Sequence, residues 1–160
     1  MDELWVLAAR VGQRLKERQE TVTVAESSAG GLISAALLAA PGASAYFLGG
    51  TVVYTRAARE GLLSLPQAAL AGMRPSTEAY AELLARTART RIGATWGLAE
   101  TGATGPTGNR YGDAPGHACL AVSGPAEKTM TIETGRAERR DNMIAFATVA
   151  LGLLAGCLDT

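Results

Sequence analysis

Short segments rich in β-branched residues alternate with longer helical segments along most of the chain, and this alternation restricts the fold more than any other feature. Such an order is typical of α/β proteins, in which helices cover both faces of a largely parallel sheet. The sequence therefore predicts a three-layer α/β/α sandwich with a mostly parallel sheet and an antiparallel pair of strands late in the chain. Strands are expected over residues 21–25, 45–54, 95–100, 117–122 and 128–133. Helices are expected over residues 2–18, 30–40, 56–63, 75–91 and 138–158.

Charge and size exclude several classes of protein. A chain of 160 residues is long enough for one domain with its own core. The 15 Lys and Arg residues balance the 15 Asp and Glu residues, so the net charge is zero. A protein that binds nucleic acid along its backbone needs an excess of Lys and Arg over Asp and Glu to displace counterions. We therefore expect no direct contact with nucleic acid.

The termini and the cysteines indicate a cytoplasmic protein. The first ten residues are acidic and lack the basic region of a signal peptide, and the apolar runs are interrupted before they reach the length of a membrane span. Cys119 and Cys157 lie far apart, as expected of buried apolar residues in a reducing compartment. We expect no membrane attachment.

The segment AESSAGG, residues 25–31, lies between an expected strand and an expected helix. In α/β sheets, ligands bind at the carboxyl ends of the strands. A serine at this point can be a nucleophile whose developing charge the helix N-terminus stabilises, and Gly30 and Gly31 allow a ligand to come close. Alternatively, Ser27 or Ser28 only caps the helix.

Two further segments follow expected strands. Arg59 lies about one helical turn after Tyr54, so the two could face one site with Arg56, or the tyrosine closes the sheet and the arginines are solvated. The segment TGATGPTG, residues 101–108, has neither the dinucleotide-binding glycine pattern nor that of a P-loop. Its backbone could still bind an anion, or it is a plain flexible loop.

The densest basic cluster, Arg136, Arg139 and Arg140, precedes the last expected helix. It could bind a phosphate, or it is a solvated helix start. His117 is the only histidine, which favours a structural role over a metal site. Together, the loops at the strand ends predict a small anionic or phosphorylated ligand.

The order of the motifs resembles the CinA C-terminal domain family, which includes stand-alone nicotinamide mononucleotide deamidases. AESSAGG is followed by Pro41-Gly42, then by FLGGTVVYTRAAR and TGATGPTG, and the likeness extends from about Val6 to Leu154. It implies a single CinA C-terminal-like domain over residues 1–160, without the large N-terminal domain of full-length CinA proteins. It also implies a hydrolase that converts nicotinamide mononucleotide and water to nicotinic acid mononucleotide and ammonia, with no cofactor and no metal.

The resemblance assigns roles to particular residues. Ser27 matches the nucleophile, Tyr54 matches the catalytic tyrosine, and Arg59 stands where the family has the lysine that activates the serine. The substrate-binding positions that it implies are Gly30, Gly31, Thr101, Gly102, Gly105 and Arg140. The expected partner is nicotinamide mononucleotide, and the apolar helices are compatible with a homo-oligomer.

Departures from the family pattern leave three hypotheses. Arginine keeps its charge and cannot replace lysine as a base, and Ala29 and Arg56 also differ from the family residues. In an active deamidase, Tyr54 would take the Ser27 proton with Arg59 stabilising the phenolate, and N–H groups near residues 29–31 would hold the oxyanion.

The second hypothesis is a catalytically degenerate homologue that only binds a nucleotide or a protein partner. The third is an interaction module without a small ligand, linked to competence or DNA repair through the family name.

Overall fold

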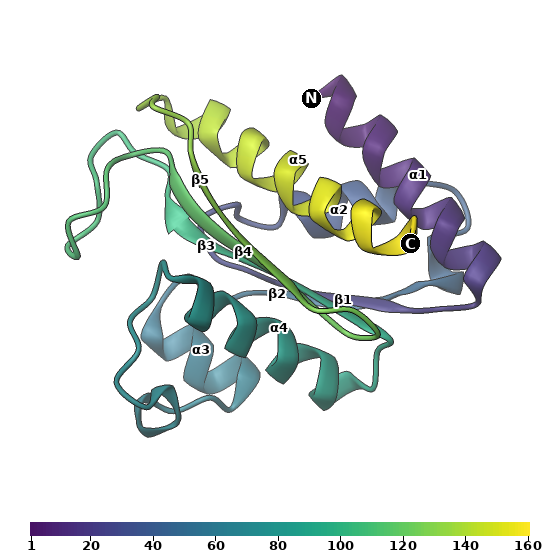
Figure 1. The fold of residues 1–160 in the computed structure, drawn as a ribbon, viewed down its shortest axis with the longest axis horizontal. Coiled ribbons are helices and arrows are strands. Elements are labelled where there is room, and N and C mark those ends of the chain that lie inside the picture. The colour runs from purple at the N-terminus through teal and green to yellow at the C-terminus, as the bar shows by residue number, and fades with distance from the viewer.

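The computed structural model describes all 160 residues as a five-stranded sheet with helices on both faces (Figure 1). The strand order across the sheet is β2-β1-β3-β4-β5. The strands are β1 (Val22–Glu26), β2 (Phe47–Val52), β3 (Trp96–Ala103), β4 (His117–Ser123) and β5 (Lys128–Glu133).

Four of the five strands run in the same direction. Strand β1 pairs in parallel with β2 and β3, whereas β4 is antiparallel to both β3 and β5. The prediction of a mostly parallel sheet in an α/β sandwich is therefore confirmed. The late antiparallel pair is also present, and β4 is the one strand that reverses direction.

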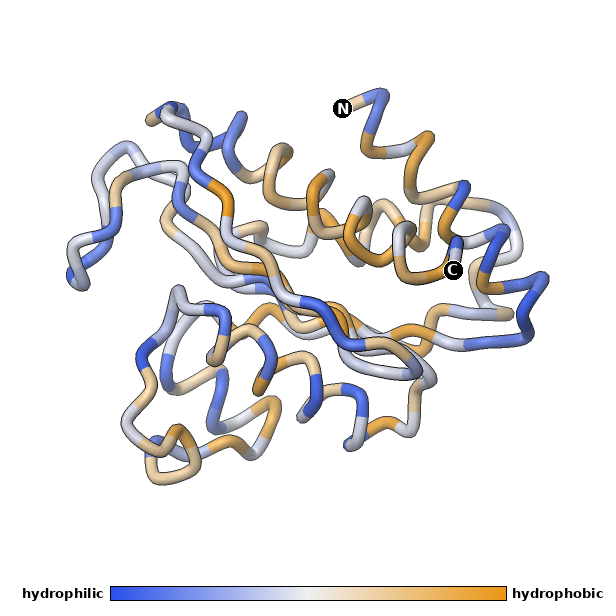
Figure 2. The backbone as a smooth tube through the Cα atoms, in the orientation of Figure 1, coloured by the Kyte–Doolittle hydropathy of each residue, from blue (hydrophilic) through white to orange (hydrophobic).

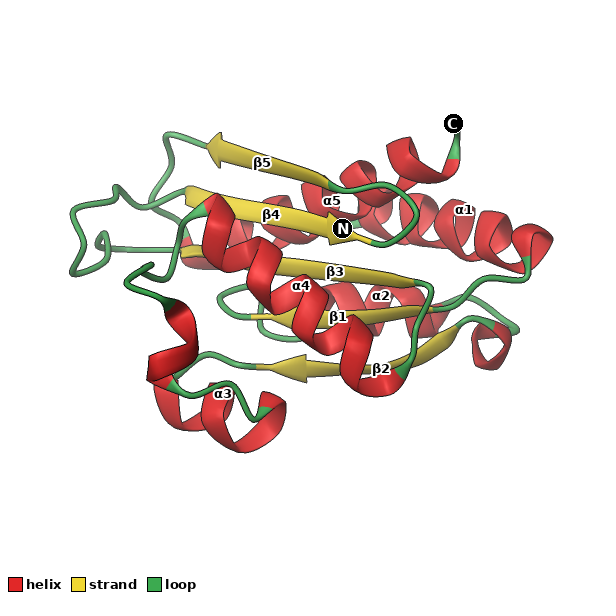
Figure 3. Cartoon of the chain, turned by 60° about the horizontal axis from the view of Figure 1, so that its bottom comes forward, coloured by secondary structure: helices red, strands yellow, loops and turns green.

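The helices form the two outer layers (Figures 1 and 3). Helices α1 (Asp2–Arg18), α2 (Leu32–Ala39) and α5 (Arg139–Leu158) cover one face, and α3 (Arg56–Leu63) and α4 (Glu78–Ile92) cover the other. Short 3-10 helices occupy Ala43–Ala45 and Gln67–Leu70.

Each face of the sheet has its own apolar core. The larger core, under α1, α2 and α5, contains Trp96 and Phe146, and the smaller core, under α3 and α4, contains Leu84 and Tyr80. Strands β1, β3 and β4 contribute side chains to both cores because their faces alternate. This burial fixes the sheet register, so that the ends of β1, β2 and β3 meet at one edge.

Helix α5 is long and apolar enough to cross a membrane, which the sequence analysis did not expect. More than half of its apolar stretch is buried in the protein, where it packs against α1 and α2. Figure 2 shows the apolar residues gathered along α5, with hydrophilic ones at its N-terminal end. In this fold α5 is a core helix.

Candidate functional site

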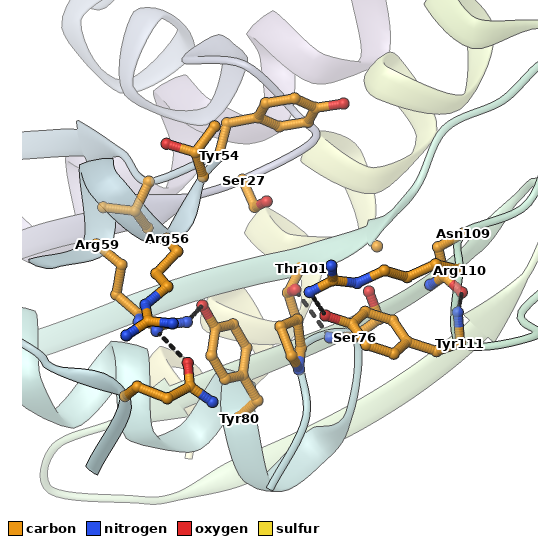
Figure 4. Close-up of a pocket in the computed structure, with 15 residues that line it drawn as sticks. Ser27, Tyr54, Arg56, Arg59, Ser76, Tyr80, Thr101, Asn109, Arg110 and Tyr111 are labelled. Carbon is orange, nitrogen blue, oxygen red and sulfur yellow. Dashed lines mark hydrogen bonds between the residues drawn. The ribbon is translucent and has the colours of Figure 1, made fainter. Parts of the chain in front are cut away.

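A cavity of about 620 Å³ lies at the carboxyl ends of β1, β2 and β3. Ser27 follows β1, Tyr54 and Arg56 follow β2, and Thr101 and Gly102 lie near the end of β3. Residues 75–76, before α4, and residues 109–111, after β3, also line the cavity. Figure 4 shows Ser27 between Arg59 on one side and the segment 109–111 on the other. Parallel strands that end at one edge thus bring together residues far apart in sequence.

Ser27 presents a hydroxyl that has no hydrogen-bond partner within the protein. Its side chain lines the cavity and is partly exposed. Helix α2 begins only at Leu32, and its N-cap is Gly31, without a side-chain cap. The alternative that Ser27 or Ser28 caps this helix is therefore wrong, and the Ser27 hydroxyl is left free for a ligand.

Glu100, which the sequence analysis did not single out, fixes the backbone around this serine. The carboxylate is fully buried and accepts hydrogen bonds from the N–H of Ser27 at 3.0 Å and of Ala29 at 2.8 Å. Its other oxygen accepts a bond from Ser28 Oγ at 2.5 Å. Burial raises the pKa of Glu100, and these hydrogen bonds oppose that rise only in part.

A second buried carboxylate, Glu26, takes the place of a helix cap. It accepts bonds from the N–H groups of Gly31 at 3.1 Å, Ile33 at 3.0 Å and Ser34 at 2.9 Å, and from Ser34 Oγ at 2.8 Å. A negative charge at this end also stabilises the helix dipole. The signal in the sequence is an acidic residue within an otherwise apolar buried strand, which Glu26 and Glu100 both show.

Few backbone donors remain near Ser27. Of the five N–H groups in residues 27–31, only that of Ser28 has no acceptor within the protein. The prediction that groups near Ala29 to Gly31 hold an oxyanion is therefore wrong, because the two carboxylates and one carbonyl already accept those bonds. Ser28 N–H is the donor that the turn leaves free.

Arg59 is buried, with 3% of its surface exposed, and points away from Tyr54. Its guanidinium donates to the carbonyl of Leu65 at 3.2 Å, to Tyr80 Oη at 3.4 Å and to Gln67 Oε1 at 2.8 Å. The expected pairing of Arg59 with Tyr54 is therefore wrong. The arginine belongs to the packing between α3 and α4, with one side on the cavity.

Tyr54 has a different cationic neighbour. The residue is 58% exposed, and its hydroxyl accepts a hydrogen bond from Arg139 Nη2 at 3.2 Å. Arg139 Nη1 also donates to the carbonyl of Gly105 at 2.6 Å. These contacts border a second cavity of about 180 Å³, which Ser28, Gly102 and Gly105 also line.

The structure brings together some of the residues that the sequence singled out and separates others. Arg140 is exposed and lines neither cavity, since the next residue along a helix points to a different side. Gly30 and Gly31 also lie outside both cavities. Their φ angles of +69° and +99° shape the turn before α2 instead. The residues that share the main cavity are Ser27, Tyr54, Arg59, Thr101 and Gly102.

Comparison with known proteins identifies the family to which this chain belongs. The profile of the CinA C-terminal domain matches residues 5–158. The chain belongs to the CinA C-terminal domain family. A CinA-like protein from Anaeromyxobacter sp. (strain Fw109-5) is 38% identical over 148 residues, which are 92% of this chain and 36% of that protein. One from Synechococcus sp. (strain CC9902) is 40% identical over 118 residues, 74% of this chain and 28% of that protein.

Solved structures of the CinA superfamily share the whole fold. A competence-damaged protein from Klebsiella pneumoniae superposes with a TM-score of 0.90 at 25% identity and covers 98% of both chains. One from Escherichia coli gives 0.87 at 28% identity and covers 95% of this chain and 89% of that one. The chain thus spans about a third of the curated CinA-like relatives and nearly all of these solved chains.

His117 lies behind the cavity wall of this CinA domain. Its Nε2 donates to the carbonyl of Ser76 at 2.9 Å, and its Nδ1 lies 2.5 Å from Glu133 Oε1. Burial of the ring lowers its pKa, but the bonds to Glu133 and Ser76 and the charge of Asp113 outweigh this effect and raise the pKa above the ordinary value. Asp113 is in turn bound by Arg74 at 2.9 and 3.2 Å. The histidine therefore joins the cavity wall to the loop after β3.

Protonated His117 should stabilise the fold. Since its pKa is higher in the folded state than in the unfolded one, its contribution is complete below the unfolded pKa of about 6.5 and is lost as pH rises through the folded pKa. We expect the free energy of unfolding of the wild type to fall relative to His117→Asn across this range. Urea unfolding of both proteins from pH 5 to 9 checks this, and parallel pH profiles would contradict it.

Proposed function

We propose that this protein is a serine amidohydrolase that releases ammonia from nicotinamide mononucleotide. The observation that carries the proposal is the free Ser27 hydroxyl, on a turn that Glu100 holds by hydrogen bonds, in a cavity lined by arginines. The motif order that resembles the deamidases of the family supports the same reaction. A cavity with arginines and no acidic side chain on its wall suits a phosphorylated substrate.

The reaction would proceed through an acyl-enzyme. Ser27 Oγ attacks the amide carbon of the nicotinamide, its proton passes to a base, and the carbonyl oxygen becomes an oxyanion. Ser28 N–H is the backbone donor that remains free to stabilise this oxyanion. The tetrahedral adduct expels ammonia after the nitrogen takes up a proton, and water then hydrolyses the ester to the nicotinic acid product and regenerates Ser27.

Tyr54 is the candidate base. Tyr54 lines both cavities, and Arg139 holds its hydroxyl by a hydrogen bond. Arg139, rather than Arg59, is therefore the arginine that contacts Tyr54. Catalytic hydrogen bonds often tighten only when substrate is bound, so the free structure is compatible with this role.

The alternative is a homologue that binds the nucleotide without hydrolysing it. The observation that favours it is that no side chain accepts a hydrogen bond from Ser27 Oγ, while Arg59, at the position of the family lysine, is engaged by neutral protein groups. A protein of this kind would retain the cavity and lack turnover.

Ammonia release from nicotinamide mononucleotide by the purified protein distinguishes the two. If Ser27 is the nucleophile, Ser27→Ala should reduce the rate at least about 10³-fold, because no other group can form the acyl-enzyme. Ser44→Ala, which changes an exposed serine outside both cavities, is the matched control. Turnover that persists in Ser27→Ala would exclude the serine mechanism, and binding without turnover in the wild type would favour the alternative.

The proposed setting is cytoplasmic, with a small nucleotide as the partner and a homo-oligomer as the assembly. The core packing of α5 supports a protein free of the membrane. The zero net charge supports the absence of direct nucleic-acid binding.

A further inference from the structure

Arg59 is buried and forms no salt bridge with an acidic side chain. Arg10, Arg56, Arg74 and Arg86, all more exposed, each contact a carboxylate. Arg59 is the most deeply buried arginine, yet its three acceptors are two neutral side chains and one carbonyl. A buried charge without a counter-charge is costly for folding, and an anionic ligand would supply the missing counter-charge.

The guanidinium also has donors to spare. Arginine carries five N–H groups, and the three bonds of Arg59 use the one on Nε and one on each terminal nitrogen. One N–H therefore remains on each terminal nitrogen, in a residue that lines the cavity. Two N–H groups on one guanidinium can bind two oxygens of the same oxyanion.

The surrounding surface reinforces this charge. Arg56 and Arg110 also line the cavity, whereas no Asp or Glu does. The partner of Arg56 is Glu60, which lies outside the cavity wall. Figure 4 shows Arg56 and Arg59 together at one side of the cavity and Arg110 at the other. This arrangement of arginines concentrates positive potential inside the cavity.

We propose that Arg59 forms an oxyanion-binding subsite at the α3 side of the cavity, which takes the phosphoryl or carboxylate group of the substrate. This subsite rests on the proposed function only in sharing the cavity with Ser27, since it binds an anion whether or not turnover occurs. Arg59 is then a substrate-binding residue and contributes no proton transfer. Gln67 and Tyr80, which also line the cavity, orient its guanidinium by accepting hydrogen bonds from it.

Calorimetric titration with inorganic phosphate and with malonate, at constant ionic strength, tests the subsite. We expect Arg59→Gln to weaken binding of the preferred anion at least about tenfold, the effect of losing a charge-assisted bidentate contact. Arg86→Gln removes the same charge from an exposed position of α4 outside the cavity and should bind like the wild type. Preference for phosphate identifies a phosphoryl group as the ligand, and preference for malonate identifies a carboxylate.

A second variant covers the case in which Arg59→Gln does not fold. Gln67 is exposed, and its Oε1 accepts from Arg59 Nη2 at 2.8 Å, so Gln67→Glu supplies the missing counter-charge with the arginine in place. It should abolish anion binding and raise the melting temperature. Wild-type affinity in either folded variant, or no anion binding by the wild type, would overturn the subsite. Anion binding without ammonia release would refute the amidase alone.

Discussion

Replacing Glu100 by leucine should destabilise the fold by about 3 kcal/mol, whereas Glu100→Gln should stay within about 1 kcal/mol of the wild type. Leucine fills the space but leaves the buried N–H of Ala29 and the partly buried N–H of Ser27 without acceptors. Each orphaned donor costs about 1–3 kcal/mol, and the added apolar burial offsets only part of this loss.

Glutamine should be tolerated at position 100 because the two carboxylate oxygens of Glu100 make different hydrogen bonds. Oε2 accepts both N–H bonds, and Oε1 contacts only the Ser28 hydroxyl. An amide oxygen can take the place of Oε2, while the amide nitrogen donates to Ser28 Oγ, which can accept as well as donate. The raised pKa of Glu100 points the same way, since burial favours a neutral side chain at this position.

Urea unfolding at pH 7 of the wild type and both variants measures the difference. Ammonia release provides a second readout, because Glu100→Leu should also displace Ser27 and lower the rate. Equal stability of the leucine and glutamine variants would contradict the assigned role of the two N–H bonds. A large loss of unfolding free energy in Glu100→Gln would show that Glu100 must be ionised.

The periodicity of the sequence was sufficient to predict the layers of the fold and the strand ends that form the cavity. It placed Ser27, Tyr54 and Thr101 after or within strands whose ends meet, which is a property of parallel topology. The roles of Glu26 and Glu100 could not be obtained in this way. A buried carboxylate is explained only by the N–H groups around it, and Glu100 is 73 residues from the Ser27 that it holds.

The contacts of the arginines also could not be predicted from the sequence. Arg139 and Arg140 are adjacent in sequence, but a helix turns about 100° per residue, so only one of them reaches Tyr54. Arg59 was expected to face Tyr54 because the two are close in the chain. Instead Thr55 caps α3 between them, and the helix directs Arg59 toward Tyr80 of α4. Spacing alone does not fix which side of a helix start a residue occupies.

Restoring lysine at position 59 should increase ammonia release by about 10²-fold or more, within the range that a general base contributes. The position is buried beside the cavity, and burial favours the neutral amine, which can accept the Ser27 proton. Arginine cannot do this, because it stays charged. At low pH, where the amine is protonated, Arg59→Lys should retain part of the anion affinity that Arg59→Gln loses, and this affinity should decline as the amine loses its proton.

The pH dependence of the Arg59→Lys rate shows whether the lysine acts as a base or only leaves more space in the cavity than arginine. In Arg59→Lys, the rate should rise with pH as the amine loses its proton, with an apparent pKa below the ordinary lysine value of about 10.4. Arg59→Gln is the matched control, since it removes the guanidinium without supplying a base and should show no increase. A rate in Arg59→Lys no higher than in the wild type would mean that the arginine is not what limits Ser27, and Tyr54→Phe would then test whether the tyrosine already serves as its base.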